Sequence, residues 1–141
     1  MVAASGSILT IAPAEYGNAC VTIEVVRDVE ILEYLDPAGR SPFALWFAGL
    51  NAVAAARVTV ALTRLGNGNF SNVEGVGAGV YEYKIDFGPG YRIYFGKDGE
   101  RIVILLGGSA KKRQSAPIAA AQTAWAAYKR AKAGKGGEKW H

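Results

Sequence analysis

Residues 80–95 read VYEYKIDFGPGYRIYF and contain two stretches in which apolar and polar side chains alternate. The first stretch runs from Val80 to Phe87 and the second from Tyr91 to Phe95, with Gly88-Pro89-Gly90 between them. Alternation with a period of two is typical of a strand that has one face on a core. Gly and Pro between two such runs favour a tight turn. The stretch therefore predicts an antiparallel hairpin.

The alternation also assigns each side chain of this hairpin to a face. One face would carry the apolar set, which consists of Tyr81, Tyr83, Ile85, Phe87, Tyr91, Ile93 and Phe95. The opposite face would carry four polar residues at cross-strand distances, namely Glu82, Lys84, Arg92 and Tyr94. We expect the apolar face to pack on helices and the polar face to point outward.

The rest of the chain predicts an α+β fold in which an antiparallel sheet is flanked by helices. Branched residues and flanking turn signals predict further strands at 21–26, 31–35 and 101–106. Ser41-Pro42 favours the start of a short helix, and residues 52–65 predict a second helix that ends at Gly66-Asn67-Gly68-Asn69. The Ala-rich run 116–132 predicts a C-terminal helix that ends at 134–137.

Helical periodicity gives each of the first two helices an expected apolar face. In the first helix this face consists of Phe43, Leu45, Trp46, Phe47 and Leu50. In the second helix we expect the core side to consist of Val53, Ala56, Val60 and Leu65.

A chain of 141 residues with 50% hydrophobic content fits one ordinary domain. We predict a domain over residues 21–133, a loosely ordered extension over 1–20 and a flexible basic tail over 134–141. The basic charge lies at the C-terminal end, since residues 111–141 carry eight basic and one acidic side chains (+7) and residues 1–40 carry two and six (−4). Such an end attracts polyanions such as nucleic acid, although solvated basic tails are also common.

Composition excludes several classes of site. Cys20 is the only cysteine, so an internal disulfide and a thiolate metal cluster are excluded. His141 is the only histidine, which excludes histidine-dependent triads and clustered histidine metal sites. We expect no metal and no cofactor. The chain has no apolar run long enough for a bilayer, and we predict a cytoplasmic protein without membrane contact.

The polar face of the hairpin suits phosphodiester chemistry. Transphosphorylation needs a group that takes the 2′-hydroxyl proton, cations near the phosphoryl oxygens and an acid for the leaving oxygen. Lysine, arginine, tyrosine and glutamate can supply these roles. The alternative is an exposed face whose charges only keep the sheet soluble.

Two further groups of cations are candidates for binding an anion. Lys111-Lys112-Arg113-Gln114 precedes the last helix, where side chains and free backbone amides can hold a phosphate together; the alternative is a solvated basic loop. Arg57 and Arg64 are seven residues apart and so project from one face of their helix. That face suits RNA backbone or an acidic partner, or is simply solvated.

Five blocks of the sequence together resemble the RelE/ParE superfamily of bacterial toxins, and most closely its HigB-type addiction-module killer proteins. The blocks are EYLDPAGRSPFALWFAGL (33–50), LTRLGNGNF (62–70), GVYEYKIDFGPGYRIYF (79–95), LLGG (105–108) and KKRQ (111–114). The resemblance implies a single RelE-like domain with a twisted antiparallel sheet, two N-terminal helices and a C-terminal helix. It also implies a cognate helix-turn-helix antitoxin, through which the toxin would meet DNA indirectly.

The resemblance further implies an mRNA endoribonuclease that acts on the ribosome by 2′-hydroxyl attack without a metal. Arg92 would contact the scissile phosphate, Tyr94 would orient the substrate and Lys84 would be a second cation. Glu82 would be an acid–base or structural residue. Residues that would hold RNA are Lys111, Lys112, Arg113, Gln114 and Arg64.

The sequence departs from the family pattern at Lys84, where arginine is usual, and at Ala116-Pro117, where a basic residue and aspartate commonly precede the isoleucine. Lysine does not reproduce the planar two-pronged contact of arginine with phosphate. Two alternatives therefore stay open: an attenuated toxin that retains only antitoxin binding, and a ParE-like inhibitor that binds DNA gyrase without chemistry.

Overall fold

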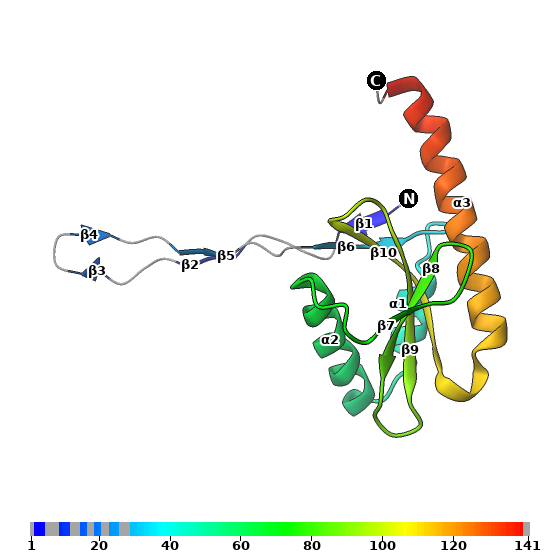
Figure 1. Ribbon diagram of the computed structural model, residues 1–141, viewed down its shortest axis with the longest axis horizontal. Coiled ribbons are helices and arrows are strands. Elements are labelled where there is room, and N and C mark those ends of the chain that lie inside the picture. Colours follow the sequence, from blue (N-terminus) through cyan, green and yellow to red (C-terminus); the bar gives the residue numbers. More distant parts are fainter. Residues whose placement is uncertain are drawn as a thin grey trace.

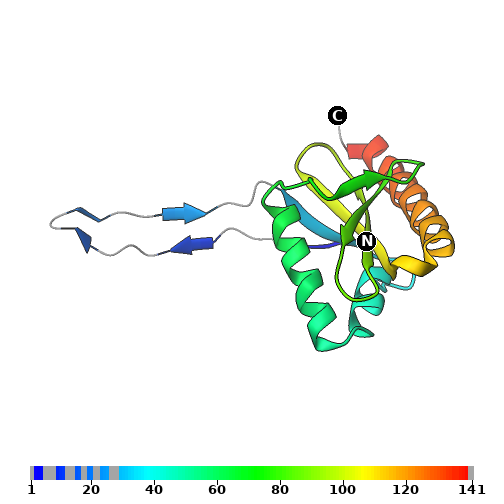
Figure 2. The ribbon, with the colours of Figure 1, turned by 60° about the horizontal axis from the view of Figure 1, so that its bottom comes forward.

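The computed structural model describes residues 29–139 continuously and, before them, the segments 2–4, 9–11, 15–16, 19–20 and 23–25; side chains are described over 29–134 except that of Arg113. The fold is α+β, as predicted. A six-stranded sheet lies between two helical layers, with α1 (Pro42–Ala48) and α2 (Ala52–Gly66) on one face and α3 (Ser115–Lys139) on the other (Figure 1). Figure 2 shows the same arrangement from another side, with α2 and α3 on opposite sides of the strands.

The sheet contains β1 (Val2–Ala4), β6 (Glu30–Tyr34), β10 (Ile102–Ala110), β9 (Tyr91–Lys97), β8 (Val80–Ile85) and β7 (Val73–Gly75), in that order. The predicted hairpin is confirmed, because β8 and β9 pair antiparallel, and β9 also pairs antiparallel with β10. The prediction of a purely antiparallel sheet is wrong, because β6 and β10 are parallel. Between β6 and β10 the sequence contains α1, α2 and the strands β7, β8 and β9. A connection of that length permits parallel pairing.

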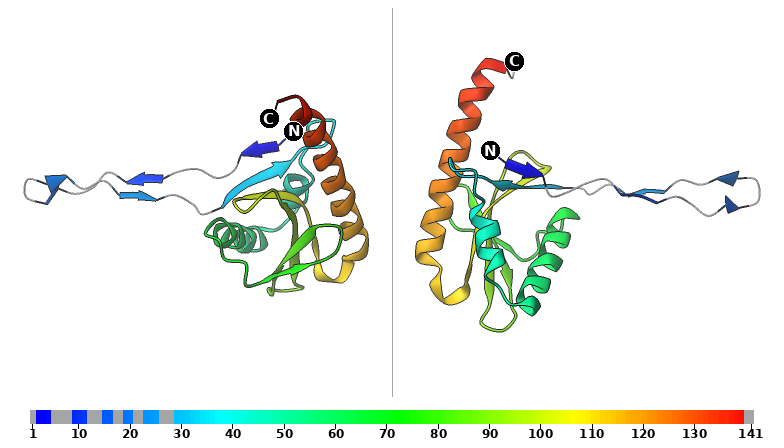
Figure 3. Two further views of the ribbon diagram at one scale, coloured as in Figure 1. Left: turned by 45° about the horizontal axis from the view of Figure 1, so that its top comes forward. Right: turned by 180° about the vertical axis from the view of Figure 1, so that it is seen from behind.

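Short strands precede β6, and all but β5 lie in the region 1–20 that was predicted to be loosely ordered. β1 pairs with β6 at the edge of the sheet. β2 (Leu9–Ile11) pairs with β5 (Ile23–Val25), and β3 (Glu15–Tyr16) pairs with β4 (Ala19–Cys20). The figures draw these two ladders away from the body of the protein (Figure 3). The strand predicted at 21–26 is thus β5, and its residues 21, 22 and 26 lie outside the described part.

The helix starts follow the capping residues. The Ser41 hydroxyl accepts a hydrogen bond from the Ala44 amide at 3.0 Å, and Pro42 occupies the first helical position, as predicted for α1. The Asn51 side chain accepts from the Ala54 amide at 2.9 Å and caps α2. Each cap satisfies an amide that has no partner within its own helix.

The buried faces of these helices differ from the prediction. Phe43 of α1 is buried, whereas Leu45 is 62% exposed. The buried face of α2 consists of Ala54, Val58, Ala61 and Leu65, so among the predicted core residues Leu65 is correct and Val53, Ala56 and Val60 are wrong. The observed spacing of four, three and four residues lies on one helical face, and two alanines allow the helix backbone to approach the sheet closely. Hydrophobicity alone favoured the larger valines over these alanines.

Each face of the sheet receives a tryptophan over a glycine. Trp46 of α1 lies on Gly108 of β10, where an added Cβ would be 2.3 Å from its ring. Trp125 of α3 lies on Gly96 of β9, where the same distance would be 2.4 Å. A side chain at either glycine would collide with a rigid ring, so both positions need glycine. β10 therefore continues through Gly107 and Gly108 to Ala110, past the predicted end of the strand, with a bulge between Leu105 and Gly107.

The C-terminal helix is longer than predicted and covers the second face of the sheet. α3 continues to Lys139, beyond the expected end at 132 and into the predicted basic tail. Ala121, Trp125 and Tyr128 of α3 form a core with Tyr94 and Ile104 of the sheet. Tyr128 and Lys132 both donate hydrogen bonds to Asp98 in the β9–β10 turn. Most of the polar face of the hairpin therefore meets a helix and not solvent.

Candidate functional site

The sheet register brings the four polar residues of the hairpin together. Glu82 pairs directly with Tyr94, and Lys84 pairs with Arg92, so all four share one face as predicted. The expectation that this face points outward is wrong. Tyr94 is 0%, Arg92 5% and Glu82 6% exposed, because α3 and the residues before it lie over them. Lys84 alone among the four is partly exposed.

The buried members of this set form a polar cluster at one end of the α3 interface. The Gln114 side chain donates a hydrogen bond to Glu82 Oε1 at 3.0 Å. Glu82 Oε2 is 3.8 Å from Arg92 Nε, and the Tyr94 hydroxyl is 2.8 Å from the Ser109 hydroxyl. We call Glu82, Arg92, Tyr94, Ser109 and Gln114 the buried polar cluster. It joins β8, β9, β10 and the turn before α3.

Sequence reasoning missed Ser109. The residue lies beyond the bulge of β10 and pairs directly with Arg92. The small polar residue after Gly107-Gly108 was the signal that could have identified it. It was not used, because the two glycines of LLGG were interpreted as the end of the strand. Ser109 is 5% exposed, and its hydroxyl accepts from or donates to Tyr94.

Arg92 has donor groups that the protein does not use. Its Nη1 donates to the Tyr91 carbonyl oxygen at 3.0 Å. Its Nε is buried and has no hydrogen-bond partner among the described residues. The separation of 3.8 Å from Glu82 is an ion pair without a hydrogen bond. A buried guanidinium with an unused donor costs free energy, and a bound anion would satisfy it.

Tyr94 is a neutral phenol at physiological pH. Burial raises the pKa of Tyr94, and the nearby Glu82 carboxylate raises it further, against the hydrogen bond from Ser109. A tyrosine in this state donates or accepts a hydrogen bond but does not act as a base. Tyr94 is therefore suited to position neighbouring groups by hydrogen bonding and not to transfer a proton.

Cations gather at and next to the cluster, around the β8–β9 turn. Lys111 and Lys112 lie in the 3₁₀ turn η1 (Lys111–Arg113) and are exposed. The Lys111 amide donates to the Gly90 carbonyl at 2.9 Å, and a Cβ on Gly90 would be 3.1 Å from the Lys111 side chain. Lys84 is on the adjacent strand, where it pairs with Glu74 at 3.1 Å. We call Lys84, Arg92, Lys111 and Lys112 the basic end.

For two of the predicted RNA-binding residues, Arg113 and Arg64, the structure does not confirm a place at the basic end. The side chain of Arg113 lies outside the described residues. Arg64 belongs to α2, where it lines a groove with Arg57 and Lys84. Gln114, by contrast, contacts the cluster directly through Glu82.

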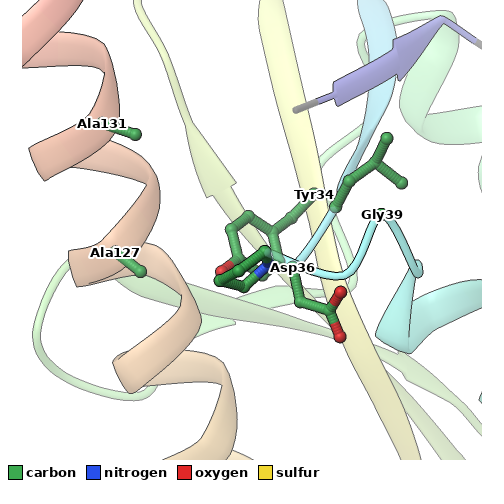
Figure 4. A pocket seen from close by; sticks show the side chains of 7 residues that line it. Tyr34, Asp36, Gly39, Ala127 and Ala131 are labelled. Atoms are coloured by element: carbon green, nitrogen blue, oxygen red, sulfur yellow. The ribbon is translucent and has the colours of Figure 1, made fainter.

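A second cavity lies between α3 and the turn after β6, with a volume of about 390 Å³ (Figure 4). Tyr34, Asp36, Ala127 and Ala131 are among its lining residues. Backbone hydrogen bonds from Arg40 and Ala38 hold the pKa of Asp36 below its usual value, with burial acting against them. Asp36 thus stabilises the local turn, and this cavity contains no group of cations among its described lining residues.

The described residues contain no group of three or more histidine, cysteine, aspartate or glutamate side chains that could hold a metal ion. Within the same residues, none of the helices has both the length and the apolar character that crossing a bilayer requires.

Comparison with known proteins identifies a relative of similar sequence. A protein of Haemophilus influenzae, whose name states no function, is 38% identical over 77 residues, which cover 54% of this chain and 78% of the relative. The chain belongs to the family of this Haemophilus protein. No family model and no solved structure matches the chain.

Proposed function

We propose that the protein is the toxin of a type II toxin–antitoxin system with a RelE-like fold, and that it cleaves mRNA on the ribosome as a metal-independent endoribonuclease in the cytoplasm. One observation carries this proposal: lysines from β8 and η1 gather around one turn, beside a carboxylate, a phenol and an arginine with an unused donor. RNA backbone is a polyanion that fits this set. The cognate antitoxin, a helix-turn-helix protein, would cover this end.

Each residue has a proposed role. Lys111 and Lys112 hold the RNA backbone, and Lys84 contacts a neighbouring phosphate. Arg92 stabilises charge on the scissile phosphate. Because Arg92 is buried and its ion-pair partner Glu82 is held by Gln114, this role needs the turn at Gln114 to move. The same movement frees Glu82 from Gln114 and lets it take or give a proton. Tyr94 positions these groups from below.

Primer extension on mRNA in a translating-ribosome mixture tests the proposal. Wild-type protein should produce discrete cuts, and Arg92→Ala should remove them. Arg130→Ala changes an exposed arginine of α3 and serves as the matched control, with folding of both variants checked by circular dichroism. Absence of cuts by the wild-type protein, or unchanged cuts by Arg92→Ala, would refute the endoribonuclease.

Burial of Glu82 and Tyr94 favours a second candidate, inhibition by binding without chemistry. A ParE-like protein would inhibit supercoiling by purified gyrase, and an attenuated toxin would allow normal growth when expressed without its antitoxin. Gyrase inhibition in the absence of mRNA cuts would establish the first of these. Normal growth with intact antitoxin binding would establish the second.

A further inference from the structure

A groove of about 320 Å³ runs between the outer side of α2 and the end of β8. Its sides differ in chemistry. Buried aliphatic and aromatic side chains line it, with Ala61, Tyr83 and Ile85 among them. Three cations, Arg57, Arg64 and Lys84, lie along it with one carboxylate, that of Asp86.

The two arginines of the groove have no carboxylate partner within ion-pair distance among the described residues. The ion pairs of the described chain use Arg40, Lys84, Arg92 and Lys132 as cations. Arg57 instead lies over the ring of Phe87, with its Cζ 4.5 Å from the ring centroid. This contact fixes the guanidinium at the rim of the groove and leaves its donors available.

Apolar side chains continue from the groove onto the exposed side of α2. Val53 is 56% and Val60 47% exposed, and both belong to the three large hydrophobic residues that are most exposed in the described chain. Val53, Arg57, Val60 and Arg64 follow one another at spacings of four, three and four residues, so they form one stripe along the helix. The stripe alternates apolar and cationic side chains.

We infer that this groove binds an acidic, amphipathic segment of a partner protein. Carboxylates would meet Arg57 and Arg64, which are two helical turns and so about 10 Å apart, while aliphatic side chains would cover Val53 and Val60. RNA fits less well, because base stacking needs an open aromatic face and that of Phe87 is already covered by Arg57. Arg64 is thereby assigned to a protein partner and not to RNA. The inference does not depend on the proposed nuclease.

Synthetic peptides of about four helical turns test the inference with the full-length protein. The probe carries two glutamates seven residues apart with leucine and valine between them on one face, and its twin carries lysines in place of the glutamates. Fluorescence anisotropy should show binding of the acidic peptide only. Amide shifts in the NMR spectrum should be confined to α2 and the end of β8.

Charge reversal separates the groove from general attraction of acids to a basic protein. Arg57→Glu combined with Arg64→Glu should weaken binding of the acidic peptide at least tenfold. Arg101→Glu combined with Arg130→Glu makes the same change in net charge at exposed positions outside the groove and should alter binding less than twofold. Val60→Ser should weaken binding by a smaller factor than the first pair, because it removes apolar contact alone.

Three results would overturn the inference. The first is no binding of the acidic peptide, and the second is an equal loss of binding in the two charge-reversal variants. The third is that single-stranded RNA, and not the peptide, shifts the amides of α2. Nuclease activity is measured in a separate assay on ribosomes, so its failure and the failure of this inference are distinguishable.

Discussion

The two faces of the sheet are both covered by helices, yet they are built differently. On the α1–α2 side, the core consists of apolar side chains such as Val58, Ile93 and Phe95. On the α3 side, a smaller core around Trp125 gives way at one end to the buried polar cluster. The interior of the first face only stabilises the fold. The second face also keeps charged groups dry beside exposed cations, and this is the arrangement on which the functional proposal rests.

Among the substitutions that compare the two faces, removal of Trp125 should cause the largest loss of stability. Trp125→Ala leaves a void above Gly96 and should reduce the free energy of unfolding by about 4 kcal/mol. Urea unfolding measures it. Trp46→Ala on the other face is the matched variant and should cost less, because Trp46 is partly exposed. An equal or larger loss for Trp46→Ala would show that α3 packs less firmly than described.

The buried ion pair gives the next largest effect. Glu82→Ala leaves Arg92 uncompensated in the protein interior and should cost about 3 kcal/mol. The double variant Glu82→Leu with Arg92→Met should recover most of this loss, since neither charge remains. Glu74→Gln breaks the exposed pair with Lys84, where Glu74 is 64% exposed, and should cost less than about 1 kcal/mol. Equal losses for Glu82→Ala and Glu74→Gln in urea would mean that the cluster is solvated.

Tyr94→Phe should cost about 2 kcal/mol, because the buried Ser109 hydroxyl would be left without its partner. The folded protein raises the pKa of Tyr94 above 10.0, so this residue adds stability below that pH. The contribution is lost as the pH rises through the folded pKa. Wild-type stability should therefore fall above about pH 10 more steeply than that of Tyr94→Phe. Parallel pH profiles would contradict the burial of Tyr94.

Loss of the tether between α3 and the β9–β10 turn should reduce stability less than loss of the buried ion pair or of the Tyr94 hydroxyl. Burial acts to raise the pKa of Asp98, but hydrogen bonds from Lys132 and Tyr128 outweigh it and lower the pKa. Asp98 then adds stability above its unfolded value of 3.8, and this stability is lost as the pH falls through the folded pKa. Asp98→Asn should cost about 1 kcal/mol at neutral pH and flatten the acid limb of the stability profile. An unchanged acid limb would show that the tether contributes nothing.

Local patterns in the sequence sufficed for the hairpin, the Ser41 cap of α1 and the sharing of a face by Glu82, Lys84, Arg92 and Tyr94. Those features depend on neighbours a few residues apart. The covering of that face by α3 did not follow from the sequence, because a polar strand face is typical of an exposed surface and only tertiary packing places Trp125 on Gly96. The parallel pairing of β6 and β10 is likewise a contact between distant segments.

The candidate site was likewise predicted in part from the sequence. Glu82 and Lys111 were identified from the sequence, but their hydrogen bonds to Gln114 and Gly90 required the fold. Ser109 was missed because the strand continues through two glycines that usually end one. The shared face of Arg57 and Arg64 on α2 was identified from the sequence. The apolar part of the stripe was missed because Val53 and Val60 were assigned to the core.

The salt dependence of RNA binding tests most directly whether the basic end meets RNA. Affinity for a single-stranded oligonucleotide is measured by anisotropy over a range of salt concentrations, for the wild-type protein and for Lys111→Ala with Lys112→Ala. The slope of log affinity against log salt should decrease in magnitude by about 1.4, or about 0.7 for each phosphate that a lysine no longer neutralises, with weaker binding throughout. Identical slopes and affinities would contradict the account.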